Sequence, residues 1–463
     1  MSSSSKSPPW AIIVGAGPSG LLLGLLLAKR GIPVQLVDLA YELDKNPRAT
    51  HYGTPAMYEL NRAGVVDEMR AQGFHPNSVC WRKLDGTYLT GIDMGILGDY
   101  PDRMVCLPLN KLGTILYEHI SKQPSATVNW GYKVVSVGQD DDKAWVNVET
   151  PDEGPKRLEA KYIIGCDGAN SQVRRSLFGD WEFPGKTWDQ QIVATNTYYD
   201  FEPYGWLDSN FIIHPEHFFM AARIGKDGLW RITYGEKPGL TLEQLRERLP
   251  AKFKTFLPGH PEPDQYKVVN FSPYKIHQRL APSMRVGRFC LAADAAHLCN
   301  PFGGMGLTGG IVDIGGLYDC LVGIHDGVAD DSILDKYSEI RSQKYNEIIN
   351  PISSDNIVRL FGQDADTALE NDEFLKMLKT AETDLDFAKE FQKGAYALQH
   401  DFTQYYKNNN NNNNPNTNNN NNNNKEPNGH ANGNGNAEAS EKVGEVAPQV
   451  PQAQAVAAGG VTD

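Results

Sequence analysis

The chain has 463 residues, a length that predicts two or three domains. Hydrophobic residues make up 40% of it and charged residues 22%, so most of the chain can bury a core. The formal net charge of −13, from 57 acidic and 44 basic residues, argues against nucleic acid or an anionic membrane as the main partner.

Six cysteines are scattered along the chain without a CxxC pair or a Cys/His cluster, so we predict no metal site. Isolated cysteines in a chain of this length are typical of reduced thiols, and we expect a cytoplasmic protein. The uncharged stretch 11–28 resembles a signal or membrane segment, but the turn GAGPSG at 15–20 interrupts it. We therefore predict no transmembrane segment, because no other stretch of the sequence looks like a membrane-spanning segment.

The chain opens with a pattern typical of a doubly wound α/β sheet. An apolar run at 11–14 precedes a glycine-rich turn, a helix at 21–30 that ends at Gly31, and a second strand at 34–38. This strand–helix–strand order predicts a Rossmann-like layer.

The first turn carries the spacing GxGxxG, and Asp38 ends the following strand. Gly15 permits a tight turn, while Gly17 lets the backbone approach a pyrophosphate at the positive end of the helix. Asp38 is placed to bind ribose hydroxyls. The pattern therefore favours dinucleotide binding, and a purely structural glycine-rich turn is the alternative. The predicted contacts are Gly15, Gly17, Pro18, Ser19, Gly20 and Asp38.

Later segments alternate between helical and strand patterns. We predict a helix at 112–121 and strands at 134–137, 144–148 and 162–166. A β-rich stretch follows, with strands at 191–199, 210–213, 218–224 and 229–234 and a helix at 242–249. A buried strand at 289–293 leads into a glycine-rich turn and a helix, and 331–407 is mostly helical, most clearly at 335–349.

Two further motifs follow predicted strands. YIIGCDGANSQVR at 162–174 runs from a strand into the turn Asp167-Gly168. FCLAADAAHLCNPFGGMG at 289–306 runs from a strand to Asp294 and then to a glycine-rich helix entrance. Together with the first turn, these motifs resemble the single-component (class A) flavoprotein monooxygenases of the para-hydroxybenzoate hydroxylase fold, over about residues 10–400.

The resemblance implies an FAD-binding domain interleaved with a second domain. We expect FAD-binding segments at 10–186 and 276–350, a β-rich substrate domain at 187–275 and a C-terminal helical region at 351–407. Residues 408–424 hold fifteen Asn in seventeen positions, so we predict that 408–463 is a disordered, low-complexity tail.

The resemblance also implies how the later motifs would hold FAD. Asp294 can hold a ribityl hydroxyl, and the glycines after Pro301 leave backbone N–H groups facing the flavin ring. Arg48 would meet the pyrophosphate or the ring, and Asn110 stands where a Gln or Arg is expected. The implied contacts are Arg48, Asn110, Asp167, Gly168, Asp294, Pro301, Gly303, Gly304, Met305, Gly306 and Leu307.

Plainer interpretations exist for three of these residues. Arg48 alone could be a solvated loop residue, Asp167 could belong to a hairpin turn, and Asp294 could cap a helix. The chain also departs from the family pattern: Ala293 replaces a Gly, Asn300 replaces a Pro, and Thr308 replaces an Asn.

The implied activity uses NADH or NADPH to reduce FAD, after which O₂ gives a flavin C4a-hydroperoxide that transfers one oxygen atom to a phenol. We expect a hydroxybenzoate- or salicylate-like substrate, with or without decarboxylation. An FAD-dependent epoxidase or hydroxylase of an isoprenoid or other secondary metabolite is the alternative, and a non-enzymatic flavin-binding regulator also remains open. A flavin-dependent halogenase is disfavoured because no Trp-x-Trp-x-Ile-Pro segment occurs. We expect a monomer or homodimer.

Substrate-binding candidates lie mainly on the β-rich stretch. Because side chains alternate along a strand, Trp230, Ile232 and Tyr234 share one face while Arg231 and Thr233 share the other. Arg223 or Arg231 could pair with a substrate carboxylate. The catalytic candidates are Pro301, Tyr234, Arg223 and His214.

Overall fold

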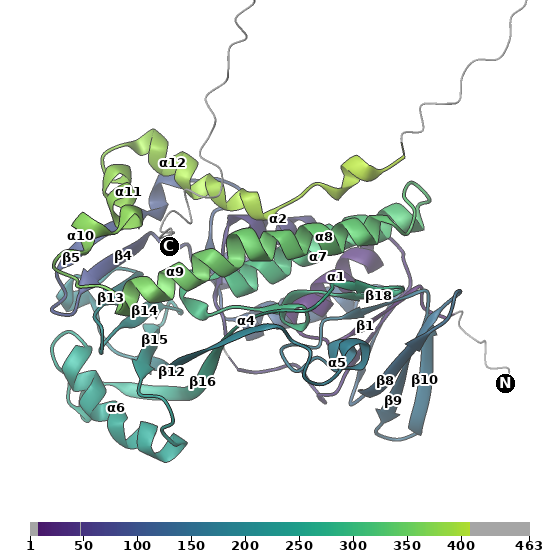
Figure 1. Ribbon diagram of the computed structural model, residues 1–463, viewed down its shortest axis with the longest axis horizontal. Coiled ribbons are helices and arrows are strands. Elements are labelled where there is room, and N and C mark those ends of the chain that lie inside the picture. The colour runs from purple at the N-terminus through teal and green to yellow at the C-terminus, as the bar shows by residue number, and fades with distance from the viewer. Residues whose placement is uncertain (1–7, 47, 408–463) are drawn as a thin grey trace, which may run out of the picture.

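The computed structural model describes residues 8–46 and 48–407 and builds them around two large sheets (Figure 1). The predicted tail at 408–463 lies outside the described residues. The first sheet has six strands in the order β17-β18-β11-β1-β2-β7. Its strands are β1 (Ala11–Val14), β2 (Val34–Asp38), β7 (Ala126–Trp130), β11 (Tyr162–Gly165), β17 (Arg285–Val286) and β18 (Phe289–Leu291).

Three motifs meet at the carboxyl ends of neighbouring strands in this sheet. β1 pairs in parallel with β11, and β11 pairs in parallel with β18. Val14 lies opposite Gly165, and Gly165 lies opposite Leu291, so the chain leaves all three strands at the same level. The three predicted motifs begin at that level, which is where α/β sheets bind their ligands.

Apolar helices cover this sheet. Helix α1 (Pro18–Lys29) packs against α4 (Leu109–Ile120) and α7 (Met305–His325), and its residues 20–28 are all buried. Contrary to the expectation that only 11–28 has this character, helix α7 is also long and apolar enough to cross a membrane, but 83% of its apolar window is buried inside the protein. Burial of that kind is typical of the core helix of a folded domain.

The second sheet has eight strands in the order β19-β16-β12-β15-β14-β13-β4-β5. It is wider than the predicted segment 187–275, because β4 and β5 come from residues 78–93 and pair through β13. The strands are β4 (Ser78–Lys83), β5 (Tyr88–Asp93), β12 (Gly185–Tyr198), β13 (Ser209–Ile213), β14 (Phe219–Arg223), β15 (Leu229–Glu236), β16 (Lys267–Leu280) and β19 (His297–Leu298).

Helices enclose the second sheet on both faces. Helix α6 (Leu242–Phe256) starts with a capping box between Thr241 and Gln244 and covers one face with Phe253 and Phe256. It runs past the predicted end at 249 and through Pro250, because its apolar face continues at helical spacing. The other face packs against α9 (Asn350–Phe361) and α11 (Glu373–Ala381).

Smaller elements complete the described chain. An antiparallel sheet of β8 (Lys133–Gln139), β9 (Ala144–Thr150) and β10 (Gly154–Ala160) includes one strand, β10, that its polar sequence did not predict. Strands β3 (His51–Tyr52) and β6 (Val105–Cys106) form a short ladder. The remaining helices are α2 (Thr54–Ala63), α3 (Val66–Gln72), α5 (Gln172–Phe178), α8 (Ile333–Lys344), α10 (Ala368–Asn371) and α12 (Leu385–Lys393).

Candidate flavin site

The first glycine-rich turn is packed against the second motif. Gly15 has φ of +104°, and a Cβ atom there would lie 2.3 Å from the carbonyl oxygen of Cys166, so the position requires glycine. A Cβ at Gly17 would meet no described atom within 4 Å. Gly17 also caps α1, whose first turn begins at Pro18 and Ser19 and is capped by no side chain of the described residues. The N-terminus of α1 is therefore open to an acceptor such as a phosphate.

Asp38 closes this turn from the next strand. Its Oδ2 accepts a hydrogen bond from the N–H of Ala16 at 2.6 Å, and its Oδ1 accepts one from the N–H of Ala40 at 2.8 Å. Each oxygen retains a further lone pair. Asp38 thus fixes the turn and can also accept from a ribose hydroxyl.

The second motif uses its carboxylate to cap a helix. Asp167 accepts hydrogen bonds from Ser171 Oγ at 2.5 Å and from the N–H groups of Gln172 and Val173. Arg174 donates to the carbonyl of Ala295 at 2.9 Å and so joins the second motif to the third. Asp167 thus holds the start of α5, and the backbone at Cys166 and Asp167 is the part of this motif that borders the first turn.

Asp294 of the third motif faces a hollow. Its side chain is exposed, yet burial among surrounding protein atoms raises its pKa, against the opposing effect of His297 and Arg48. A side chain that is both exposed and desolvated lies within a concave surface. Ala293, before it, adopts φ of +54°, which explains why a glycine is usual at this position.

The loop after Asp294 is anchored by the unexpected Asn300. Its N–H donates to Gln278 Oε1 and its Nδ2 to the carbonyl of Ser353, both at 2.6 Å, while its Oδ1 accepts from the N–H of Phe302. Pro301 and Gly303 follow in a short 3₁₀ turn. Helix α7 then begins with Gly304 as its cap, and within residues 8–46 and 48–407 no side chain caps it. Its first-turn residues are Met305, Gly306 and Leu307.

These features fit a dinucleotide that carries a ring system. The N-terminal ends of α1 and α7 both offer open N–H groups, and Asp294 is exposed yet desolvated beside them. Asn110 on α4 has a buried Oδ1 that makes no hydrogen bond in the described part of the chain. Buried polar atoms are normally hydrogen-bonded, so this oxygen can accept a hydrogen bond from a ligand. Arg48 lies at the exposed rim with its Nε 3.0 Å from Asp44 Oδ2.

The second sheet adds a cation to the same region. Arg231 on β15 donates from Nε and Nη2 to Asn196 Oδ1, each at 3.0 Å, and from Nη1 to the carbonyl of Arg48. Burial lowers the pKa of Arg231. Tyr274 on β16 is 38% exposed, yet burial raises its pKa to about 12, so it too faces a hollow. The charge of Arg231 opposes that rise, which indicates that the two groups are close.

His51 on β3 borders Arg231 from the side of the first domain. Burial, and then the charge of Arg231, lower the pKa of His51 to about 4, so its ring is neutral near pH 7. Its Nδ1 lies 2.8 Å from Thr50 Oγ1, and its buried Nε2 has no partner among the described residues. Sequence reasoning left His51 undecided and did not name Tyr274, because only folding brings each of them near Arg231 on β15.

Three of the four catalytic candidates lie elsewhere. Tyr234 is fully buried beside Phe253 and Phe256 on the opposite face of β15, as strand alternation requires. Arg223 stacks over Phe74 at 5.3 Å. The Nδ1 of His214 accepts N–H groups of its own turn. Of the four candidates only Pro301 adjoins the third motif, and Arg231, which the sequence also offered for the substrate, lies on the face of β15 opposite Tyr234.

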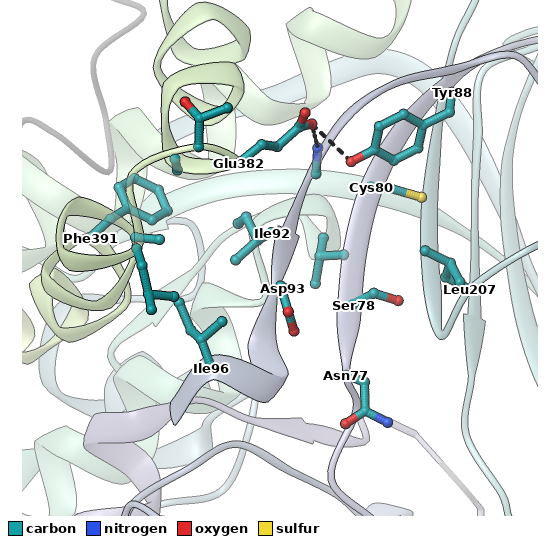
Figure 2. A pocket seen from close by; sticks show the side chains of 16 residues that line it. Asn77, Ser78, Cys80, Tyr88, Ile92, Asp93, Ile96, Leu207, Glu382 and Phe391 are labelled. Atoms are coloured by element: carbon teal, nitrogen blue, oxygen red, sulfur yellow. Dashed lines mark hydrogen bonds between the residues drawn. The ribbon is translucent and has the colours of Figure 1, made fainter. Parts of the chain in front are cut away.

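A separate pocket of about 400 Å³ lies between strands β4 and β5 and the C-terminal helices α11 and α12 (Figure 2). Glu382 reaches from the helical side and accepts hydrogen bonds from Tyr88 Oη, Thr90 Oγ1 and the N–H of Gly91. It covers the polar edge of β5, the last strand of the sheet. None of the predicted site residues that the structure describes lines this pocket. Among residues 8–46 and 48–407, no group of three or more His, Cys, Asp or Glu is placed to hold a metal ion.

Comparison with known proteins agrees with this geometry. Residues 10–350 match the family described as FAD binding domain. Para-nitrophenol 4-monooxygenase of Pseudomonas sp. (strain WBC-3) is 35% identical over 82% of this chain and 93% of its own length. The 6-hydroxy-3-succinoylpyridine 3-monooxygenase HspB of Pseudomonas putida (strain DSM 28022 / S16) is 38% identical over 76% of this chain and 89% of its own length.

Solved structures give the same result. The crystal structure of p-nitrophenol 4-monooxygenase PnpA from Pseudomonas putida DLL-E4 matches with a TM-score of 0.79 and 34% identity, over 84% of this chain and 98% of that one. A complex of aklavinone-11 hydroxylase with FAD and aklavinone shares the fold, with a TM-score of 0.68 and 23% identity over 79% of this chain and 71% of that one. The chain therefore belongs to the FAD-binding class A flavoprotein monooxygenases, and it is an FAD-dependent NAD(P)H monooxygenase of aromatic compounds.

Proposed function

We propose that this enzyme hydroxylates an acidic phenol or a hydroxypyridine that binds as its anion. Two relatives above 30% identity act, by their names, on para-nitrophenol and on a hydroxysuccinoylpyridine. Both compounds carry an aromatic hydroxyl and an electron-withdrawing substituent. The hydroxybenzoate- or salicylate-like substrate predicted from the sequence also carries an aromatic hydroxyl, but its acidic group is a carboxyl.

Arg231 is the observation that carries this proposal. Its guanidinium is desolvated, and Asn196 and the carbonyl of Arg48 hold it on the face of β15 opposite the one that α6 covers. A cation fixed in a desolvated site stabilises an ionised aromatic oxygen more strongly than one in water does. An ionised hydroxyl makes the aromatic ring more electron-rich, which favours attack on an electrophilic oxygen.

The motif residues would hold FAD in the following way. The diphosphate would lie against the open N-terminus of α1, and Asp38 would accept from the adenosine ribose. Asp294 would accept from the ribityl chain, and the first turn of α7 would face the ring. Asn110 Oδ1 would accept from a ring or ribityl donor. When bound, FAD supplies hydride acceptance from NAD(P)H and the activation of O₂.

The flavin contacts that we propose are the residues of the three motifs and their neighbours: Gly15, Gly17, Pro18, Ser19, Gly20, Asp38, Asn110, Gly168, Asp294, Pro301, Gly303, Gly304, Met305, Gly306 and Leu307. Arg48 contributes its carbonyl to Arg231 and its charge to Asp294. All six cysteines are free thiols, which supports a cytoplasmic location.

A substrate panel tests the proposal. Purified holoenzyme is given NADH or NADPH with 4-nitrophenol, 6-hydroxynicotinate, salicylate, 4-hydroxybenzoate or a prenylated phenol of ordinary acidity. We expect accelerated cofactor consumption and a product with one added oxygen atom, or with loss of CO₂, for the acidic compounds. Product mass is required because NAD(P)H consumption without oxygen transfer yields only H₂O₂. Turnover confined to the weakly acidic prenylated phenol would contradict the proposal and favour the isoprenoid alternative.

A further inference from the structure

A buried charged cluster lies directly against the turn that presents Asp294. It consists of Asp313 on α7, His297 on β19 and Arg341 on α8, and each is at most 2% exposed. Asp313 Oδ1 accepts from Arg341 Nε at 2.7 Å, and its Oδ2 lies 2.8 Å from His297 Nε2. Its neighbours therefore satisfy the carboxylate of Asp313 on both oxygens.

Asp313 also holds the backbone of the third motif. Its Oδ2 accepts a hydrogen bond from the N–H of Ala293 at 3.0 Å. Ala293 is the non-glycine residue with φ of +54°, a conformation that residues with a Cβ rarely adopt. Backbone strain of this kind persists only where surrounding contacts hold it in place.

The cluster keeps this anchor ionised. Burial by itself would raise the pKa of Asp313, but the charges and hydrogen bonds of His297 and Arg341 outweigh it and hold the pKa below its ordinary value. A hydrogen bond from an N–H to a carboxylate is about twice as strong as one to a neutral acceptor. Helix α7 also packs closely here, since a Cβ at Gly310 would lie 2.7 Å from Ala293 Cβ.

We propose that Asp313 is a positioning residue for FAD: it holds Ala293 in its strained conformation and thereby aims the Asp294 carboxylate into the flavin hollow. This inference rests on the flavin contact proposed above for Asp294, and it requires no particular aromatic substrate. Arg341 extends the link, because its Nη1 donates to the carbonyl of Leu398 in the segment Gly394–Leu398. The ion cluster therefore connects the third motif to the C-terminal end of the described chain.

The test uses apoprotein prepared from the full chain, with FAD binding followed by quenching of flavin fluorescence. We expect Asp313→Asn to raise the Kd for FAD about tenfold, because the amide loses the charge that anchors Ala293. Ala293→Gly, which removes the conformational strain, is expected to change Kd less than about twofold alone. Combined with D313N, it should recover most of the lost affinity.

Asp319→Asn is the matched control. Asp319 lies on the same helix and pairs with Arg62, away from the turn. D319N is expected to lower the melting temperature of the apoprotein while leaving the Kd for FAD unchanged. A general loss of stability in α7 is thereby separated from a loss of positioning.

Three results would overturn the inference. D313N could bind FAD as the native protein does, or its weakened binding could persist unchanged in the double variant with A293G. If D313N does not fold, the single variant A293G decides, because relief of strain predicts a higher melting temperature of the apoprotein and a lower one contradicts it. Since every readout is FAD binding or apoprotein stability, failure of the proposed substrate class leaves this test unaffected.

Discussion

The two large sheets contribute to the site in different ways. The six-stranded sheet acts through backbone conformation: Gly15 and Ala293 have positive φ, and the ends of α1 and α7 present N–H groups. The eight-stranded sheet acts through a row of side chains, with Asn196 and Arg231 directly opposite each other on β12 and β15. We therefore expect short local motifs to hold the cofactor, and substrate binding to depend on pairing between distant strands.

The largest effect is expected in the first glycine-rich turn. Gly15→Ala places a Cβ 2.3 Å from the Cys166 carbonyl oxygen in a backbone conformation that disfavours it, so we expect failure to fold or complete loss of bound FAD. Gly17→Ala meets no described atom within 4 Å, so we expect a native melting temperature with at least about tenfold weaker FAD binding. Circular dichroism and FAD titration measure both effects. Equal behaviour of the two variants would contradict the distinction between packing and ligand approach.

The next largest effect is expected at His51, where the two sheets meet. The pKa of His51 is about 4 in the folded protein and about 6.5 in the unfolded chain, because burial and then Arg231 disfavour the charged ring. The unfolded chain therefore takes up a proton that the folded protein does not. Stability present above about pH 6.5 should be lost as the pH falls towards 4, by up to about 3 kcal/mol.

Urea unfolding of the apoprotein at several pH values measures this loss. His51→Gln should flatten the pH dependence in that window, since glutamine does not titrate there. His119→Gln, at a partly exposed ion pair with Glu68, is a suitable control that should leave the loss in place. An unchanged acid limb in H51Q would show that His51 is not buried beside Arg231.

The contrast between the sheets also explains what could be predicted from the sequence. The strand–turn–helix at 11–30 and the third motif at 289–306 are each one continuous stretch of sequence. Their strands, turns and helices could therefore be predicted from residues that are close together in the chain. Their departures from the family pattern could not be interpreted in that way. Ala293 depends on Asp313, which is 20 residues away, and Asn300 depends on Gln278 and Ser353.

The second sheet shows the limit of sequence reasoning. Alternation along β15 predicts that Arg231 and Tyr234 face opposite ways, but it does not say which face a helix covers. That choice is made by α6, whose Phe253 and Phe256 cover Tyr234. The pairing of β13 with β4 could not be predicted from the sequence either, because the two strands are about 130 residues apart in the chain.

A pair of variants on β15 tests which face serves the reaction. Arg231→Met should reduce kcat/KM for the best aromatic substrate about tenfold or more, because the cation for the ionised hydroxyl is lost. Tyr234→Phe should remain within about twofold, because the Tyr234 hydroxyl has no hydrogen-bond partner in the described residues. Steady-state kinetics with product detection measure both. A larger loss in Y234F than in R231M would reverse the assignment of the two faces.

The smallest effect is expected at the start of α6, on the face of the sheet opposite the one that carries Arg231. Thr241 accepts the N–H of Gln244, and the Gln244 side chain accepts the N–H of Thr241, which closes both ends of a capping box. Thr241→Ala should lower the free energy of unfolding by about 1 kcal/mol without changing FAD affinity or kcat/KM, because α6 covers Tyr234 and not Arg231. Thr241→Ser, which keeps the hydroxyl, should restore the stability. Denaturant unfolding measures the free energy of unfolding, and FAD titration on the same samples measures the affinity for FAD. A change in FAD affinity in T241A would show that the two sheets are coupled through this helix.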